Sequence, residues 1–264
     1  MKEENKHYVD VSKVTIREIG KATAKEMIVT HHYSHAWTMC RYALGVFYET
    51  DKNDVLGNSE QLIGCLVYGY PVGRSAIKSV IDGLEKDQCL ELTRLFIHDG
   101  YGSNIESYAM GQSFQWIKEN ASNIKMLLSY ADPEQLHLGG IYQATNWLYQ
   151  DCRDIQLMPN YSISIQSNPH KWIHSRTVFS KWGSHNLIHL KTQMGKENIA
   201  EFWRKKESAK HRYIQVLGQT KSEKRKLAKQ LKHKVSPYPK DASEFLSEVV
   251  HHETFEPENK VNFW

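Results

Sequence analysis

One short segment limits what this chain can fold into: the apolar run Met126–Tyr130 and the residues after it. The run ends in the polar tip Ser129-Tyr130-Ala131-Asp132, and Pro133 then stops the strand. In α/β proteins ligands bind beyond the carboxyl ends of the strands, so the tip predicts a site. A carboxylate and a phenol at such a tip suit acid–base chemistry. The alternative is an ordinary strand-to-turn corner in which Asp132 caps the next helix.

The other periodic runs predict a mixed α/β fold, in which a mixed β-sheet is flanked by helices. β-rich runs precede the tip, helical runs lie on both sides of it, and short closing strands follow. The expected strands are Tyr42–Tyr48, Leu62–Tyr70, Cys89–His98, Ser162–Ile165 and Thr177–Trp182, and the expected helices are Ile16–His31, one ending near Asn120, and Ile141–Tyr149.

Composition excludes several classes of protein. The first thirty residues have no apolar core segment, which predicts no signal peptide, and no run is long enough to span a membrane. The cysteines form no CxxC pair and mostly have apolar neighbours, so we expect buried thiols of a reduced protein in the cytoplasm. They are Cys40, Cys65, Cys89 and Cys152.

Charge divides the chain into three expected parts: a core of residues 1–190, a basic extension of residues 191–240 and an acidic tail of residues 241–264. The extension carries a formal charge of +11 and the tail −5, within a total of +4. Such a segment favours a polyanion partner, with nucleic acid the leading candidate, although a solvated helix face is the alternative. Thr220 and Glu223 predict a capping box that opens a basic helix to about Lys234. The expected phosphate-binding residues are Arg204, Lys205, Lys206, Lys210, Arg212, Lys224, Arg225 and Lys226.

A glycine loop, Asp99–Asn104, leads into the second helix. Free N–H groups at a helix N-terminus hold anions, so the loop predicts a cofactor site, although a plain strand-to-helix turn is the alternative. The expected cofactor-binding residues are Gly100, Gly102, Ser103, Asn104 and Ser107.

Three histidines lie within five residues, at positions 31, 32 and 35. Imidazoles so close together bind a metal or relay protons, although a polar helix terminus is the alternative. A metal ion such as iron is therefore left open, with His31, His32 and His35 as candidate ligands.

Several short motifs together resemble the Mom family of bacteriophage DNA-modification proteins, within the acetyltransferase-like (GNAT) superfamily. They cover most of residues 30–240 in the expected order. The motifs are His32-Tyr33, Ile63–Gly69, Leu90–Leu95, Ser129–Asp132, Gly140–Trp147 and Lys210–Tyr213.

The resemblance implies a GNAT-like core and an enzyme that adds a methylcarbamoyl group to the N6 amine of adenine in DNA, which blocks host restriction enzymes. The matching functional positions are His32, Tyr33, Asp132 and Tyr142. The superfamily implies acetyl-CoA or a related acyl donor, and a phage origin implies the bacterial host cytoplasm. The implied partner is double-stranded DNA, no membrane partner is expected, and the oligomeric state is left open.

Adenine N6 is a weak nucleophile, so Asp132 is the candidate that positions or deprotonates it. Tyr142 and Tyr33 would orient the base or donor, or protonate a leaving thiolate. The base is expected to flip out of the duplex and to stack on an aromatic side chain: Trp37, Tyr130 or Trp147.

Two other functions compete with this prediction. One is a GNAT N-acyltransferase that acts on a protein or small-molecule amine, and the other is a DNA-binding protein without enzymatic activity. A methyltransferase ranks low because no glycine motif for S-adenosylmethionine is visible.

Overall fold

The computed structural model describes residues 8–50, 59–72, 76–155, 160–165, 171–207, 209–241, 243–245 and 250–255. These residues form two compact units. The first contains Met1–Ala131, Gly139–Asp151 and His211–Tyr238, and the second contains Asp132–Leu138, Cys152–Lys210 and Pro239–Trp264.

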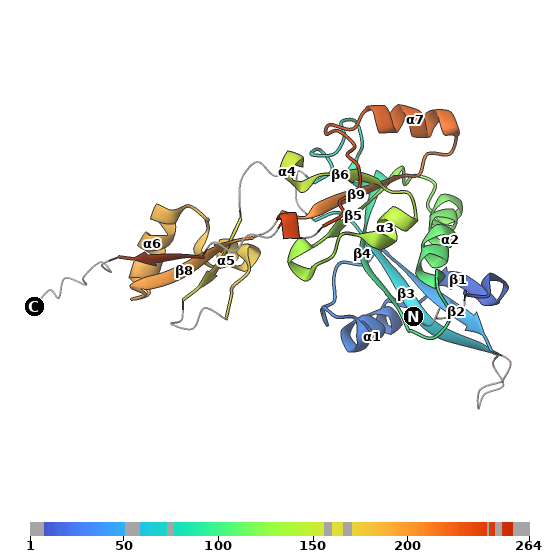
Figure 1. Cartoon of the computed structure of the whole chain (residues 1–264), viewed down its shortest axis with the longest axis horizontal. Coiled ribbons are helices and arrows are strands. Elements are labelled where there is room, and N and C mark those ends of the chain that lie inside the picture. The colour runs from blue at the N-terminus through green and yellow to red at the C-terminus, as the bar shows by residue number, and fades with distance from the viewer. Residues whose placement is uncertain are drawn as a thin grey trace, which may run out of the picture. The chain divides into compact units, whose positions relative to one another are not determined.

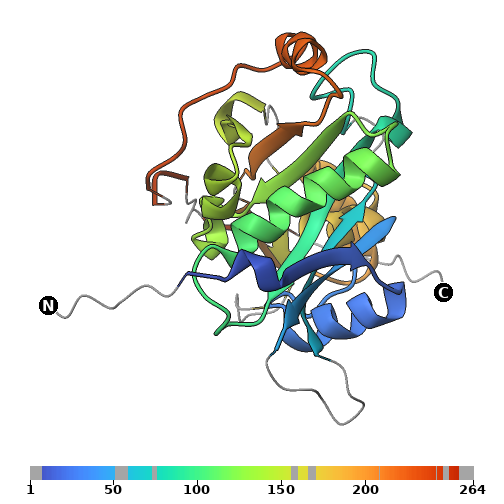
Figure 2. The same ribbon diagram turned by 90° about the vertical axis from the view of Figure 1, so that its right-hand side faces the viewer.

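A mixed sheet forms the centre of the first unit (Figures 1 and 2). In the described residues its strand order is β1-β2-β3-β4-β5-β9-β6, in which β4 and β5 are parallel and the other neighbours antiparallel. The strands are β1 (Val14–Glu18), β2 (Tyr42–Glu49), β3 (Glu60–Gly69), β4 (Cys89–Ile97), β5 (Met126–Ala131), β6 (Leu148–Gln150) and β9 (His211–Val216). The helices are α1 (Lys21–His31), α2 (Ile105–Asn120), α3 (Gly140–Ala144) and α7 (Lys221–Lys229), with single 3₁₀ turns at Val11–Lys13 and Lys86–Gln88.

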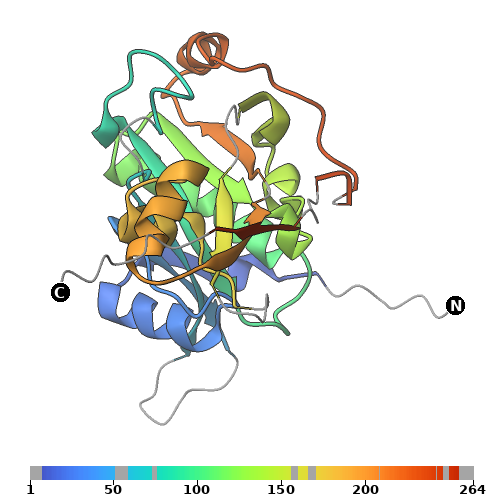
Figure 3. The same ribbon diagram turned by 90° about the vertical axis from the view of Figure 1, so that its left-hand side faces the viewer.

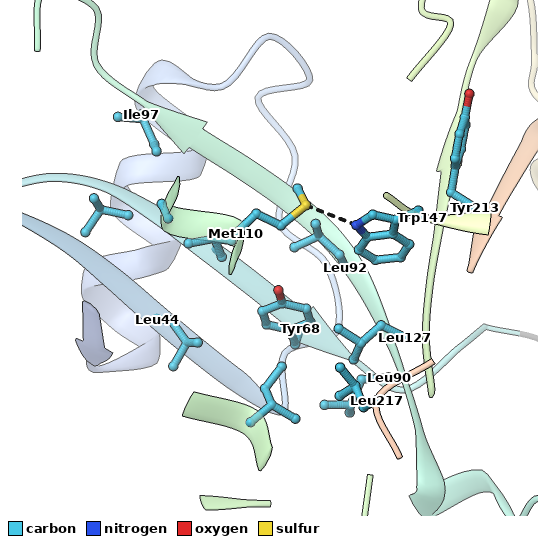
Figure 4. Close-up of a cluster of buried hydrophobic side chains, with 14 of the residues drawn as sticks. Leu44, Tyr68, Leu90, Leu92, Ile97, Met110, Leu127, Trp147, Tyr213 and Leu217 are labelled. Carbon is cyan, nitrogen blue, oxygen red and sulfur yellow. Dashed lines mark hydrogen bonds between the residues drawn. The ribbon is translucent and has the colours of Figure 1, made fainter. Parts of the chain in front are cut away.

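Helices α1 and α2 cover opposite faces of this sheet. Neighbouring residues of a strand point to opposite faces. Ala43 and Cys65 pack with α1, whereas Leu44 and Leu66 belong to the large core that includes α2. Figure 4 shows the centre of that core, where Trp147 donates its indole N–H to the sulfur of Met110 at 3.2 Å. The expected α/β class, with a mixed sheet flanked by helices, is therefore confirmed.

Two expected helices are shorter than predicted, because strand pairing takes part of each. Residues 14–18 form β1, where Ile16 pairs with Val46, and the helix begins only at Lys21. Likewise α3 ends at Ala144, and Leu148–Gln150 pairs with β9 as β6. The polar tip of the expected first hairpin, residues 51–58, lies outside the described residues.

The compact units do not follow the boundaries expected at residues 190 and 240. The basic extension is divided between the units, since β9 pairs with both β5 and β6 inside the central sheet. Helix α7 begins where predicted: Thr220 Oγ1 accepts from the N–H of Glu223 at 3.1 Å, while Glu223 accepts from Gln219 N. The helix ends at Lys229, before the predicted Lys234.

The second unit contains a three-stranded sheet of order β10-β8-β7 among the described residues (Figures 1 and 3). Part of the acidic tail is ordered as β10, which pairs with β8. The predicted strand Thr177–Trp182 is wrong: it lies in helix α5, because Val178 and Trp182 bury one helical face and Gly183 ends it at φ +78°. The elements are β7 (Tyr161–Ser164), β8 (Glu201–Lys206), β10 (Val250–Thr254), α4 (Cys152–Ile155), α5 (Ser175–Trp182) and α6 (Leu187–Lys196), with 3₁₀ turns at Pro133–Gln135 and Ser243–Phe245.

The four cysteines are free thiols, and three of them are buried as expected, whereas Cys40 is half-buried. In the part of the chain that the structure describes, no helix has the length and apolarity needed to cross a bilayer.

Glu207 joins elements of the second unit. Its carboxylate accepts from Ser162 Oγ at 2.7 Å, from Ser175 N at 2.8 Å and from Ser175 Oγ at 2.7 Å. Burial alone would raise the pKa of Glu207, but these bonds and nearby His174 outweigh it, so the pKa is lowered.

We expect Glu207→Gln to reduce the free energy of unfolding by about 2 kcal/mol at neutral pH, because the carboxylate accepts several bonds. A group whose folded pKa is lowered stabilises above its unfolded pKa and loses that contribution as pH falls through the folded pKa. The difference between wild type and variant should therefore shrink below the usual glutamate range. Urea titrations at neutral and acidic pH measure it, and an equal difference at both would contradict the assignment.

Candidate active site

The central feature of the candidate site is a fork between the parallel strands β4 and β5. The two strands pair at Cys89↔Met126, Leu90↔Leu127 and Glu91↔Leu128, and in the described register they pair no further. Past this point β5 continues beside β9. We call the point where β4 and β5 separate the fork; it leaves an edge of β4 without its neighbour.

Ser129 is the first residue of β5 past the fork, and it is buried, with 1% of its surface exposed. Its hydroxyl donates to the main-chain oxygen of Leu92 at 2.9 Å and lies 2.7 Å from the hydroxyl of Tyr142. The bond to Leu92 ties the two separated strands together, and the bond to Tyr142 fixes its phenol at the fork.

Tyr142 is held by the close packing of helix α3. Gly139 precedes the helix at φ +72°, and a Cβ there would lie 2.5 Å from the ring of Tyr213 and 2.9 Å from that of Tyr142. A larger residue at this position would therefore displace both rings. The ring of Tyr142 lies 4.9 Å from that of Tyr213 and 5.2 Å from that of Trp147. Burial raises the pKa of Tyr142 to about 12, with a smaller contribution from Tyr33, so the phenol is neutral at physiological pH.

A pocket of about 460 Å³ opens beside the fork, within the usual size range of ligand sites. Its walls come from the end of β4, the start of α2 and the residues of α3 that flank Tyr142. They are Leu95, Phe96, Ile97, Asn104, Glu106, Ser107, Gly140, Ile141 and Ala144.

The pocket contains two of the five expected cofactor-binding residues, Asn104 and Ser107. The other three, Gly100, Gly102 and Ser103, lie in the glycine loop but do not line the pocket. Ser103 accepts from Val9 N at 3.1 Å, and a Cβ on Gly102 would meet Val9 N at 2.5 Å, so the N-terminal segment packs against this part of the loop. Gly100, at φ +100°, faces open space.

These walls suit an acyl donor with an amide-bearing arm. The edge of β4 past Leu92 offers main-chain groups, while Ile97 and Ile141 offer apolar surface. Helix α2 begins at this end of the pocket, where main-chain N–H groups of a first turn suit an anion, and the carboxylate residue Glu106 lies in the same turn. Ser107 already donates its hydroxyl to Asn104 O at 2.9 Å.

The two residues expected at the corner after α1 differ in exposure. His32 is buried, with 7% of its surface exposed, and its Nδ1 lies 2.9 Å from Ser34 Oγ. The ring of Tyr33 lies 4.2 Å from that of His32, and Tyr33 is 64% exposed. Tyr33 therefore remains accessible to a large substrate, whereas His32 supports the corner from within.

The three histidines do not converge. His31 packs its ring against Phe96 and His98, at 5.6 and 4.7 Å, and His35 Nδ1 lies 3.0 Å from Val29 O. Among the residues that the structure describes, no group of three or more His, Cys, Asp or Glu is arranged to hold a metal ion. Each of the three candidate ligands thus contacts different neighbours.

Asp132 follows β5 directly in the chain and belongs to the second unit. Its Oδ2 accepts from the ammonium group of Lys210, 78 residues later. Lys210, expected at DNA phosphates, is instead the partner of the candidate base.

Arg212 is wrong as a phosphate-binding residue, because it is buried, with 3% of its surface exposed. Its Nε donates to Gln150 Oε1 at 2.8 Å and its Nη1 to Ser79 Oγ at 3.0 Å, and burial lowers its pKa. Trp147 is wrong as a base-stacking residue for the same reason, since it is fully buried in the core.

The other expected cations differ in availability. Arg204 donates to Glu253 on β10 at 2.7 Å, so the acidic tail neutralises it. Lys205 and Lys224 are half-buried, whereas Lys206, Arg225 and Lys226 are exposed. The exposed three are therefore the better candidates for phosphate contacts.

We expect Arg212→Met to reduce the free energy of unfolding by about 3 kcal/mol, because it leaves Gln150 and Ser79 without their buried partner. Arg225→Met, the matched control, should change stability by less than about 0.5 kcal/mol.

If the exposed cations bind phosphates, Arg225→Met should instead reduce the salt dependence of DNA binding by about one unit of slope. Denaturant titration and binding at several salt concentrations measure both. A stable Arg212→Met variant with a reduced salt slope would contradict the assignment.

Ser129 is the site residue that the sequence reasoning did not single out. A serine within a strand tip carries no local signal, and its partner Tyr142 lies thirteen residues away. Its role becomes visible only where β4 and β5 separate.

Comparisons with known proteins agree with the motif pattern. The model of the Mom protein family matches residues 13–240. The methylcarbamoylase Mom of Escherichia phage Mu is 26% identical over 219 residues, which are 82% of this chain and 80% of that protein.

Similar solved structures include two acetyltransferases of Vibrio cholerae. The spermidine/spermine N-acetyltransferase SpeG with manganese ions has a TM-score of 0.37 at 9% identity, over 78% of this chain and 94% of that one. The spermidine N-acetyltransferase with CoA and spermine has a TM-score of 0.31 at 11% identity, over 53% and 83%. These scores are low, so the fold rests on the strand pairing described above. Because the family model matches most of its length, the chain belongs to the Mom protein family.

Proposed function

We propose that this chain is a phage DNA-modification enzyme that transfers a methylcarbamoyl group to the N6 amine of adenine in DNA and so protects the DNA from host restriction. Membership of the Mom family supports the proposal, as does the relative of phage Mu that is named a methylcarbamoylase. The main structural support for the proposal is the bond between Ser129 and Tyr142 at the fork, beside a pocket of ligand size.

The acceptor amine has its lone pair delocalised into the adenine ring, so it must be held in line with the donor carbon while its proton is removed. In the proposed step N6 bonds to that carbon, the bond to the leaving group breaks with its electron pair, and one N6 proton passes to Asp132. Tyr142 orients the amine, and Tyr33 contacts the base or donor.

The pocket beside the fork is the proposed place of the donor. Ile97 and Ile141 would hold its apolar part, while Asn104 and Ser107 lie at the end that α2 provides. An acyl-CoA-type donor, when bound, supplies an activated carbon and a good leaving group.

Duplex DNA hides the amine within the helix, so the proposal requires that the adenine flip out. The exposed cations proposed to bind phosphates are Lys206 in the second unit and, separately, Arg225 and Lys226 in the first. Arg204 joins them only if it leaves Glu253.

The test offers the purified chain three acceptors in the presence of host cell extract as a source of the donor: plasmid DNA, a polyamine mixture and a lysine-rich protein. The proposal predicts a mass increase on deoxyadenosine alone. Modification of the polyamines or the protein, with unmodified DNA, would instead support an N-acyltransferase of small molecules or proteins.

A further inference from the structure

The carboxylate of Glu253 lies between two cations of the second unit. Arg204 on β8 donates its Nε to Glu253 Oε1 at 2.7 Å, and Nζ of Lys191 on α6 lies 3.1 Å from Glu253 Oε2. Burial alone would raise the pKa of Glu253, but the bonds from Arg204 and Lys191 outweigh it, so the pKa is lowered and the group is an anion at neutral pH. Each oxygen of one anion is thus bound by a different cation.

The two cations are arranged as a site for such an anion. The guanidinium of Arg204 packs over the ring of Tyr161, 4.9 Å from its centre, which limits the positions that this long side chain can take. The side chains of Arg204 and Lys191 are 22% and 31% exposed, whereas that of Glu253 is 14% exposed. The cations are therefore more open to solvent than the carboxylate that they hold.

A phosphodiester matches this arrangement. Like a carboxylate, it has two anionic oxygens on one atom, and an arginine binds both kinds of group in the same geometry. Lys206 lies two residues after Arg204 on the same face of β8, and it is exposed. A phosphate at Arg204 would therefore extend the surface on which Lys206 is proposed to bind DNA.

Glu253 belongs to an element that can be displaced. β10, the dark red strand beside β8 in Figure 1, is an edge strand: in the described sheet it pairs only with β8, and four of its five residues are exposed. A strand with so little buried surface separates from its neighbour at a lower cost in free energy than a buried strand does. An anion that competes with Glu253 therefore has access to Arg204 and Lys191.

We infer that Arg204 and Lys191 form a phosphate-binding site for DNA, and that Glu253 occupies this site in the structure as an internal competitor. The inference rests on the proposed function and deepens it, because it adds a DNA contact in the second unit and a restraint on DNA binding. Since Glu253 is part of the same chain, it competes at a high effective concentration whatever the sequence of the duplex. The acidic strand thus lowers the affinity for DNA in general.

The test compares the binding of a short duplex by the full chain and by its Glu253→Gln variant at several salt concentrations, without any donor. The substitution keeps the shape of the side chain but removes its charge, so Arg204 and Lys191 become available to phosphates. Each added phosphate contact steepens the fall of log K with log salt by about 0.9. We expect the variant to bind at least about tenfold more tightly at about 0.1 M salt, with a slope steeper by about one to two units.

Glu201→Gln is the matched control. Glu201 lies on the same strand as Arg204, and its carboxylate, 49% exposed, lies 3.1 Å from Nε2 of His252. The variant removes the same charge from the same sheet, so it should change the affinity by less than about threefold, because salt screens an exposed charge. Adding Lys191→Met to Glu253→Gln should take back about one unit of the added slope.

Each outcome decides the question, once circular dichroism has shown that the variants are folded. A Glu253→Gln variant with the wild-type slope would overturn the inference and leave the proposed function in place, because Glu253 would then only hold β10 against β8. An equal gain in Glu201→Gln, or a gain that survives Lys191→Met, would overturn it as well. If neither the wild type nor any variant binds the duplex, the inference falls together with DNA as the substrate.

Discussion

Replacing Tyr142 by phenylalanine is expected to reduce the rate of DNA modification by about 10²–10³-fold, in keeping with the loss of one positioned acid–base or orienting group. The variant removes one oxygen atom, and with it the bond from Ser129 and the hydroxyl proposed to orient the amine. The ring and its contacts with Tyr213 and Trp147 remain, so α3 should keep its place. Single-turnover kinetics with saturating DNA measure the change.

The matched control for this variant is Tyr213→Phe. Tyr213 packs against the same ring, and its hydroxyl accepts from Gln143 at 3.4 Å. Its loss should change the rate by less than about tenfold. A folded Tyr142→Phe variant with more than a third of the wild-type rate would remove Tyr142 from the reaction.

Asp132→Asn is expected to have the second large effect, about 10²–10³-fold on the rate, because an amide does not take up the proton that N6 must lose. The substitution keeps the size of the side chain but weakens the ion pair with Lys210. Since both side chains of that pair are partly exposed, the accompanying loss of stability should be small, and a thermal melt separates it from the kinetic effect.

Asp241→Asn is a control for the loss of a carboxylate elsewhere in the second unit. Asp241 is exposed and accepts from the N–H of Ser243 at 2.8 Å. This variant should modify DNA at the wild-type rate. If Asp132→Asn also does so while folded, another group must accept the proton.

The local elements of the fold could be predicted from the sequence because their signal is local. The alternation in Cys89–Ile97 and the apolar spacing in Ile105–Asn120 give a strand and a helix whatever surrounds them. Helix α5 could not be predicted in this way, since Thr177 and Val178 favour strands by propensity. The burial of Val178 and Trp182 on one helical face outweighs that preference.

Long-range pairing explains what the sequence reasoning missed at the site. A count of charges cannot show that Arg212 is buried, because its partners Gln150 and Ser79 lie 62 and 133 residues away. The partnership of Lys210 with Asp132 is hidden for the same reason. Asn104 and Ser107 could be placed at a pocket because the glycine loop and the helix start lie next to each other in the chain.

The most direct test of the account is mass spectrometry of nucleosides from plasmid DNA of cells that express this chain, beside cells that express Tyr142→Phe. We expect a deoxyadenosine that carries a methylcarbamoyl group on N6 with the wild-type chain, and at most a trace of it with the variant. Unmodified deoxyadenosine in the presence of abundant, folded wild-type protein would contradict it.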